Sequence, residues 1–278
     1  MFVTGPDQRG LVASIANFIF ENNGNIVHSD HHIDRETGLF LTRVEWELDG
    51  FRIPGLEIGA RFAPIAEAMR VSWELHFSEE RERLAIFVSK YDHCLNDLLL
   101  RQATGELRCD ISLVVSNHPD LRPLAEHFRI PYHVFPITAA TKKEQEAKEL
   151  ELLAEHGIGL IVLARYLQVF TPEFVARYPN QMINIHDSFL PAFTGAGPYK
   201  QAHARGVKLI GATSHYVTDQ LDDGPIIEQD VVRVSHRDTV EDLKRKGRDL
   251  ERVVLARAVR LHLEHRVLAY GRKTAVFD

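Results

Sequence analysis

The sequence has little cysteine and no long hydrophobic run. Only Cys94 and Cys109 occur among 278 residues, too few for a disulfide framework or a four-cysteine zinc site, which favours a reducing compartment. No uninterrupted apolar stretch reaches the roughly 18 residues of a membrane-spanning helix, and the N-terminus lacks the basic region and apolar run of a secretory signal. These absences predict a cytoplasmic protein.

The sequence also lacks an excess of positive charge and the motifs of two common enzyme classes. Its formal net charge is -6 at pH 7, which gives no general attraction to nucleic acid or to an anionic membrane. Gly-x-Ser-x-Gly is absent around Ser188, which argues against a serine hydrolase, and the absence of His-Glu-x-x-His argues against a metal-dependent enzyme of that kind. We therefore expect no metal, no cofactor, and neither nucleic acid nor membrane as a partner.

The composition that remains, 45% hydrophobic and 26% charged, is that of an ordinary globular protein. Residues 1 to 77 carry a pattern of their own, with apolar residues at helical spacing after a first short strand. The expected elements are a strand at 1–4, a helix from Leu11, β-like runs at 25–33 and 39–48, a helix at 58–69 and a strand at 72–77. The order β-α-β-β-α-β predicts a ferredoxin-like α+β domain.

Two segments of this domain resemble ACT domains, small regulatory modules that bind amino acids. They are the turn at residues 5–10, which leads into the first helix, and Gly24-Asn25-Ile26, which opens the next strand. The free N–H groups of a helix N-terminus can hold a ligand carboxylate; a tight turn without a ligand is the alternative. The resemblance implies a regulatory site for a small amino-acid effector and, because such domains usually pair across subunits, a homo-oligomer, either a tetramer or a hexamer. The residues implied for that site are Asp7, Gln8, Gly10, Asn25 and Ile26.

A charged stretch at residues 78–83 is the expected linker, and a different pattern follows over 84–278. Apolar strands at 84–89, 110–116, 132–135 and 160–163 alternate with helices. Strands separated regularly by helices predict a mainly parallel sheet covered on both faces, as in Rossmann-like α/β domains. Near the end, a capping box from Asp238 to Glu241 is expected to open a helix that runs to about Glu264.

The residues best suited to chemistry lie in the later part of this domain. Asn184 and His186 are two residues apart, so on an extended segment their side chains point the same way, and Asp222 follows one strand later. A neutral amide can donate to a developing oxyanion, an imidazole can shuttle a proton, and a carboxylate can hold an imidazolium or orient a water. An isolated Asn-x-His is more often a hydrogen-bonded turn, so the pair alone does not indicate a catalytic site, and the neighbouring sequence has to be considered.

Those surroundings resemble a known family over essentially the whole chain. The segments that carry the resemblance are Asn184 to Ala196 (Asn-Ile-His-x-Ser-Phe-Leu-Pro-Ala-Phe-x-Gly-Ala), Gly211 to Thr218, and Leu221 to Ile227. They are similar to the catalytic core of the formyltransferase fold that uses 10-formyltetrahydrofolate, and the added ACT-like domain is similar to that of formyltetrahydrofolate deformylases. The resemblance implies hydrolysis of 10-formyltetrahydrofolate, as a substrate and not a cofactor, to tetrahydrofolate and formate. This reaction supplies formate and balances the one-carbon folate pool for purine synthesis.

The resemblance also implies roles for individual residues. Asn184, His186 and Asp222 match the family's catalytic asparagine, histidine and aspartate. The residues that match the folate-binding segments are Leu163, Ala164, Arg165, Tyr166, Leu167, His215, Asp219, Gln220, Leu221 and Gly224. One position departs from the pattern, because Asp187 stands where family members often carry a second histidine. A carboxylate close to His186 would favour the imidazolium.

Water and an amine are the two acceptors to be distinguished. Glycinamide ribonucleotide transformylases, which share this fold, have a small loop of glycine and serine around the substrate phosphate, whereas this chain has Ser89 to Cys94 with bulky side chains. Such side chains oppose close backbone approach to a phosphate, which favours water; the alternative is that Lys90 and His93 bind an anion in another way. A formyltransferase acting on an amine, and a catalytically inert protein that senses amino acids or folate, are the alternative functions.

Overall fold

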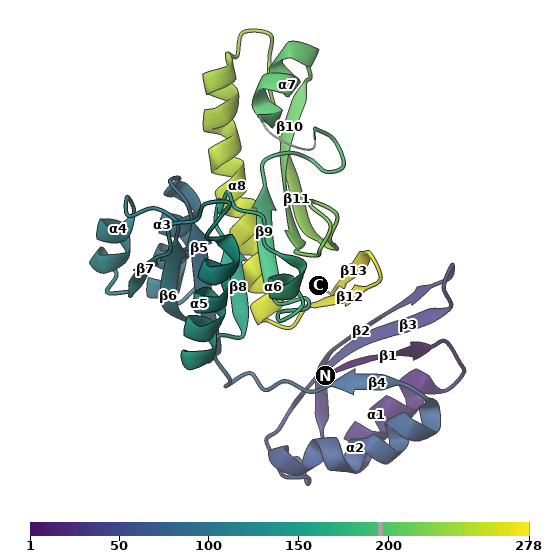
Figure 1. Cartoon of the computed structure of the whole chain (residues 1–278). Coiled ribbons are helices and arrows are strands. Elements are labelled where there is room, and N and C mark those ends of the chain that lie inside the picture. The colour runs from purple at the N-terminus through teal and green to yellow at the C-terminus, as the bar shows by residue number, and fades with distance from the viewer. Residues whose placement is uncertain (194–196, 278) are drawn as a thin grey trace. The chain divides into compact units, whose positions relative to one another are not determined.

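The computed structural model describes residues 1 to 193 and 197 to 277, so Thr194, Gly195, Ala196 and Asp278 lie outside the described residues. The chain divides into two compact units (Figure 1). The first unit contains Met1–Glu80 and two short segments from the end of the chain, and the second contains Arg81–Glu264 and Ala269–Thr274. In the described residues no helix has both the length and the apolar composition needed to cross a bilayer.

The first unit has the predicted β-α-β-β-α-β order. Its elements are β1 (Phe2–Pro6), α1 (Leu11–Glu21), β2 (Asn25–Asp34), β3 (Leu39–Glu47), α2 (Gly55–Met69) and β4 (Ser72–Glu74). The strands form an antiparallel sheet in the order β2-β3-β1-β4. Apolar residues of α1 and α2 form one buried cluster with residues of β1 and β3, and the rings of Phe18 and Phe62 meet edge to face with centroids 5.2 Å apart. The predicted ferredoxin-like fold is therefore confirmed.

Residues from the end of the chain belong to this first unit. The final hairpin, β12 (Val267–Tyr270) and β13 (Lys273–Val276), forms a two-stranded sheet that the sequence did not predict. The Phe277 ring lies 5.9 Å from that of Phe2, and Arg43 Nε donates to the carbonyl of His265 at 2.7 Å. The expected domain of residues 84 to 278 thus differs from the observed second unit at its C-terminal end.

The second unit is built on a seven-stranded sheet in the order β11-β10-β9-β8-β5-β6-β7. Its strands are β5 (Glu82–Val88), β6 (Cys109–Ser116), β7 (Tyr132–Val134), β8 (Leu160–Leu163), β9 (Met182–His186), β10 (Leu209–Tyr216) and β11 (Ile226–Arg233). Its helices are α3 (His93–Ala103), α4 (Arg122–His127), α5 (Lys142–Glu155), α6 (Pro172–Val175), α7 (Pro198–Arg205) and α8 (Val240–Leu263). Strands β5 to β9 pair in parallel and β10 pairs antiparallel with β9 and β11, which confirms the mainly parallel α/β fold.

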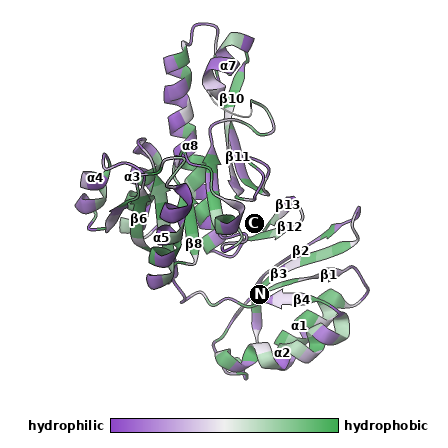
Figure 2. Cartoon of the chain, viewed as in Figure 1, coloured by the Kyte–Doolittle hydropathy of each residue, from purple (hydrophilic) through white to green (hydrophobic). Residues whose placement is uncertain are grey.

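The two central strands, β5 and β8, are largely apolar because both faces of the sheet are covered. Every residue of β8 is buried, as are the last five of β5. Figure 2 shows β8 in the green of hydrophobic residues. The chain crosses from β7 back to the other side of β5 to form β8, so the ends of β5 and β8 flank the point where the strand order reverses. Open α/β sheets bind ligands at such a point, beyond the carboxyl ends of the strands.

The start of α8 differs from the sequence prediction by one residue. The capping box is formed by Thr239 and Asp242, since the Thr239 hydroxyl accepts from the Asp242 N–H and the Asp242 carboxylate accepts from the Thr239 N–H. The predicted pair, Asp238 and Glu241, is wrong, because Asp238 instead accepts from the Ser235 N–H at 2.7 Å. Glu241 and Asp242 both lie in the first turn of α8, so the sequence alone did not show which of them closes the capping box.

Candidate active site

A cavity of about 590 Å³ lies in the second unit. Its walls come from the loops that follow β5, β8 and β9 and from the loop between β10 and β11, with α8 contributing one side. The cavity thus lies beyond the carboxyl ends of the strands, where the strand order reverses between β5 and β8. The cavity contains Asn184, His186 and Asp222, the three residues that the sequence singled out.

Asn184 and His186 lie on β9 and both line the cavity, as their spacing predicts for an extended strand. His186 Nδ1 lies 3.2 Å from Asp222 Oδ1, and both side chains are about one-tenth exposed. The hydrogen bond with His186 lowers the pKa of Asp222 below its ordinary value, against the opposing effect of burial. The structure therefore joins an ionised carboxylate to one nitrogen of a buried imidazole.

The other nitrogen of this imidazole is available. His186 Nε2 is buried and has no hydrogen-bond partner among the described residues. A buried polar atom without a partner is costly unless something binds to it. Because Nδ1 is held by Asp222, Nε2 is the atom that can meet a bound substrate or water.

His215 forms the adjoining part of the site. It lies on β10 opposite Asn184, and its side chain is buried. Its Nε2 is 3.3 Å from Asn184 Nδ2 and 3.9 Å from Asp222 Oδ1, while its Nδ1 is 2.8 Å from the Tyr216 carbonyl oxygen. The site is thus a connected group of one amide, two imidazoles and one carboxylate.

Most of the segments matched to folate binding line the cavity. Those that do so are Leu163, Arg165, Tyr166, Leu167, His215, Asp219, Gln220 and Leu221. Ala164 and Gly224 do not line it. A Cβ on Gly224 would lie 1.7 Å from the carbonyl oxygen of Tyr216, so only glycine allows the loop that carries Asp222 to pack so closely on the end of β10.

Asp187 is paired with a cation. Its carboxylate lies 3.0 Å from Arg165 Nη2, and Arg165 Nε lies 3.4 Å from the buried carboxylate of Glu251 on α8. Glu251 also meets His93 Nε2 at 2.9 Å and accepts from the Tyr199 hydroxyl at 2.6 Å. The negative charge next to His186 is therefore opposed by a guanidinium, which the sequence did not reveal.

Burial acts to raise the pKa of Glu251, but the hydrogen bond from His93, the charge of Arg165 and the Tyr199 hydroxyl outweigh it and hold the pKa below its ordinary value. Gly247, one turn earlier on α8, makes this arrangement possible, since a Cβ there would lie 2.0 Å from the Tyr199 hydroxyl oxygen. Glu251 is thus an ionised group in a buried position, satisfied by three side chains.

Sequence reasoning did not select Tyr91, Tyr199 or Glu251, and it named His93 only as an alternative anion ligand, although all four line the cavity. One signal was available for Glu251. It lies on the buried face of α8 with Gly247 and Val254, so a carboxylate occupies an otherwise apolar stripe. Buried carboxylates are rare unless they are paired, which marks such a position for attention.

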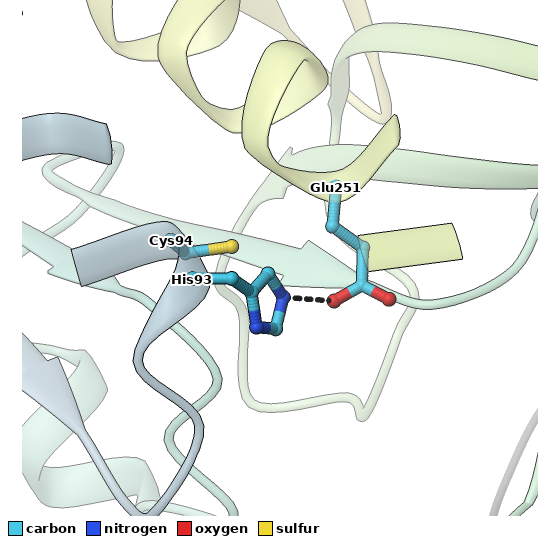
Figure 3. A group of neighbouring side chains, drawn as sticks. All are labelled: His93, Cys94 and Glu251. Atoms are coloured by element: carbon cyan, nitrogen blue, oxygen red, sulfur yellow. Dashed lines mark hydrogen bonds and ion pairs between the residues drawn. The ribbon is translucent and has the colours of Figure 1, made fainter. Parts of the chain in front are cut away.

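One group within the described residues has the side chains to hold a metal ion, namely His93, Cys94 and Glu251 (Figure 3). The contacts around it oppose this use. The Glu251 oxygen that meets His93 also faces Arg165 Nε at 3.4 Å, so a cation is already beside it. Burial raises the pKa of the Cys94 thiol well above its ordinary value, which disfavours the thiolate that a metal requires. We therefore assign the group to the Arg165 ion-pair network.

A second buried carboxylate lies behind the cavity wall. Glu149 on α5 is fully buried, its Oε1 accepts from the Tyr166 hydroxyl at 3.4 Å, and its Oε2 has no partner among the described residues. Burial and the nearby charge of Glu146 raise the pKa of Glu149 to about 8. Tyr166 lines the cavity, so this carboxyl supports the wall from behind.

Replacing Glu149 by glutamine is expected to flatten the pH dependence of stability. The folded carboxyl keeps its proton up to about pH 8, whereas the unfolded one loses it near 4.5, so its contribution is fully present below pH 4.5 and is lost as the pH rises to about 8. Between pH 5 and pH 8, the free energy of unfolding of the unmodified protein should fall by roughly 1 to 3 kcal/mol more than that of Glu149→Gln. Urea titrations at both pH values measure this. Glu151→Gln, exposed on the same helix, is the control and should match the unmodified protein; equal slopes for Glu149→Gln would contradict the expectation.

The residues implied for a regulatory site lie in the first unit around the start of α1. Gly10 has φ 91° and precedes α1 as its N-cap residue, with no side-chain cap hydrogen bond. Gln8 Nε2 donates to the carbonyl of Met69, Asn25 Nδ2 donates to Glu47 Oε2 at 2.8 Å, and the Asp7 N–H donates to Gly38. Ile26 is 36% exposed. A ligand role for these residues stays a prediction.

Comparison with known proteins gives consistent results. The family described as formyl transferase matches residues 82–259. The chain is 60% identical over 277 residues to a formyltetrahydrofolate deformylase from Synechocystis sp., covering 100% of this chain and 97% of the relative. It is 50% identical over 279 residues to the formyltetrahydrofolate deformylase of Bacillus subtilis, covering 100% and 93%. A crystal structure of a formyltetrahydrofolate deformylase from Pseudomonas syringae pv. tomato superposes with a TM-score of 0.97 at 47% identity, covering 100% of this chain and 93% of that one.

Proposed function

The chain belongs to the formyltetrahydrofolate deformylase family, and we propose from this and from the site that it hydrolyses 10-formyltetrahydrofolate to tetrahydrofolate and formate. The observation that carries the proposal is the state of His186. One ring nitrogen is held by the ionised Asp222 and the other is buried, unpartnered and part of the cavity wall. Such an imidazole can donate to, or accept from, a group bound in the cavity.

In the proposed mechanism, water is the nucleophile. Asp222 orients it and accepts its proton, directly or through His186, as the oxygen adds to the formyl carbon. Asn184 Nδ2–H and His186 Nε2–H donate to the oxyanion of the tetrahedral intermediate. The intermediate collapses by breaking the bond between the carbon and N10, N10 receives the proton, and formate leaves. Where the proton passes through His186, the Asp222 carboxylate, 3.2 Å from Nδ1, holds the ring in place and opposes its positive charge.

Residues after β5 support water as the acceptor. Tyr91 and His93 of the loop from Ser89 to Cys94 line the cavity, where a transferase would need room for an amine substrate. His93 is engaged with Glu251, and the Ser89 hydroxyl is engaged with Asn117 at 2.7 Å and with the N–H of Leu167 at 3.0 Å. These side chains are already satisfied inside the protein, so they are poor ligands for a substrate phosphate.

Incubation with 10-formyltetrahydrofolate, with and without an amine acceptor, tests this function. Formate release that does not depend on the amine is the expected result. Transfer that requires the amine would support the transferase alternative, and no turnover would support an inert sensing protein. Both products, formate and tetrahydrofolate, are measured so that their ratio of one to one can be checked.

The folate contacts, the effector site and the oligomeric state are inferred from the resemblance to the same family. We infer that the cavity residues around Leu163–Leu167 and Asp219–Leu221 contact the folate, and that the first unit binds a small amino-acid effector and pairs with another copy in a homo-oligomer. We also infer a cytoplasmic location, from the scarcity of cysteine, and a role in the folate pool that serves purine synthesis. Both cysteines, Cys94 and Cys109, are free and buried.

A further inference from the structure

The tautomer of His215 is fixed by its surroundings. Its Nδ1 lies 2.8 Å from the carbonyl oxygen of Tyr216, and a carbonyl oxygen can only accept a hydrogen bond, so Nδ1 carries the hydrogen. The loop at Gly224 packs directly on this carbonyl, where even a Cβ would lie 1.7 Å from the oxygen. The bond is therefore shielded from water and holds the ring in one orientation.

The second nitrogen of His215 then acts as an acceptor. Burial lowers the pKa of His215. The hydrogen bond to the Tyr216 carbonyl and the charge of Asp222 act in the opposite direction but do not outweigh it, so the net direction favours the neutral ring. A neutral ring with its hydrogen on Nδ1 has a bare Nε2, and the atom that meets it at 3.3 Å is Asn184 Nδ2, which can only donate. Donor and acceptor are thus matched without any protonated histidine.

This hydrogen bond has a consequence for the amide of Asn184. An asparagine side chain can rotate by half a turn and exchange its oxygen and nitrogen, which are similar in size. In this site the rotation would place the amide oxygen against the bare Nε2 of His215, so two lone pairs would face each other. The nitrogen is therefore held toward His215, and its second N–H remains for a group bound in the cavity that Asn184 lines.

We propose that His215 is a positioning residue, which acts as a neutral acceptor that fixes the amide of Asn184 so that an N–H, and not the oxygen, faces the formyl oxygen of the substrate. This rests on the proposed function. The strand geometry supports it, because β10 pairs with β11 with a register shift between Ser214 and His215, and such bulges re-aim a side chain. His215 therefore raises the rate through Asn184 and does not itself carry the proton.

Two variants separate the acceptor from the rest of the ring. His215→Gln keeps an oxygen acceptor at the position of Nε2, whereas His215→Asn keeps a donor near the Tyr216 carbonyl but has no acceptor that reaches Asn184. We expect His215→Asn to lower kcat on the order of 10- to 100-fold with KM changed less than about threefold, because an oxyanion donor is no longer oriented. His215→Gln should retain kcat within several-fold of the unmodified protein.

Two further measurements exclude a merely structural role. In an Asn184→Ala background, His215→Asn should cause no additional loss of kcat, since the two residues act as one unit. The profile of kcat against pH should keep its midpoints in His215→Gln, because a neutral positioning residue does not titrate during catalysis.

Three results would overturn the proposal: equal losses in the glutamine and asparagine variants, additive losses with Asn184→Ala, or loss of a pH midpoint in His215→Gln. Circular dichroism and tetrahydrofolate binding confirm that each variant is folded. If the proposed function itself is wrong, the unmodified protein will release no formate without an amine, which distinguishes that result from a failure of the His215 proposal.

Discussion

Replacing Asp222 by asparagine is expected to lower kcat for formate release by at least 100- to 1000-fold. Asparagine keeps the size of the side chain and a hydrogen bond to His186, but it carries no charge to stabilise the imidazolium and accepts no proton from water. The effect should fall on kcat, with tetrahydrofolate binding retained within a few-fold, because the cavity walls at Leu163 and Leu167 are unchanged. Steady-state formate release and equilibrium folate binding measure the two quantities.

The neighbouring residue gives a matched control. Asp223 is the next carboxylate in the same loop, its side chain is 40% exposed and it pairs with Arg272. Asp223→Asn should keep kcat within about twofold, since exposed ion pairs contribute little. Near-normal formate release by Asp222→Asn would remove Asp222 from the mechanism, whereas an equal loss in both variants would point to damage to the loop.

The contact between Asp222 and His186 also leads to a prediction about stability at acid pH. The pKa of Asp222 is lower in the folded protein, so its contribution to stability is present above the unfolded pKa of 3.8 and is lost as the pH falls through the lower folded value. Asp222→Asn should therefore lose less stability than the unmodified protein over the lowest pH range in which the fold persists.

Replacing Arg165 by methionine is expected to lower the free energy of unfolding by about 3 to 5 kcal/mol. Arg165 is 14% exposed and lies between the carboxylates of Asp187 and Glu251, at 3.0 Å and 3.4 Å. Methionine fills a similar volume but leaves two negative charges in a buried region without their cation. Most of the loss comes from this uncompensated charge, because an ion pair that is replaced as a whole costs far less than one that is broken.

Urea denaturation measures this loss, and two comparisons identify its cause. Arg257→Met removes an arginine whose pair with Asp230 is 46% and 38% exposed, and it should cost less than about 1 kcal/mol. The double variant Arg165→Met, Glu251→Gln should recover part of the stability, since one of the stranded charges is removed as well. A loss equal to that of Arg257→Met, or no recovery in the double variant, would show that the network is not held together by charge.

Local patterns predicted the element order of the first unit and the mainly parallel sheet of the second, but not the C-terminal hairpin of β12 and β13. The period of two along β9 predicts that Asn184 and His186 share a face, and the apolar runs of β5 and β8 predict strands covered on both sides. These signals are local because they depend on the repeat of a strand or helix. The predicted capping residue of α8 was wrong by one position. Glu241 and Asp242 are neighbouring carboxylates that could each close a capping box, and only the backbone geometry distinguishes them.

The contacts around Asp187 could not be predicted in the same way. Asp187, Arg165 and Glu251 come from two strand ends and a helix that are far apart in the chain, and nothing in their spacing indicates that they meet. The sequence identified Asp187 as a departure from the family pattern and allowed an effect on His186. The structure supplies the partner, Arg165, which changes the expected consequence from a direct influence on the imidazole to a role in holding the loop after β9.

The packing of Phe277 on Phe2 also governs the order in which the protein can be completed during synthesis. Residues of the C-terminal hairpin belong to the first unit, where Arg43 binds the carbonyl of His265 and the rings of His76 and His265 stack at 3.7 Å. These segments leave the ribosome only after the whole of the second unit has been translated. The Phe2 side chain of the N-terminal sheet therefore lacks its contact with Phe277 until that segment has been translated.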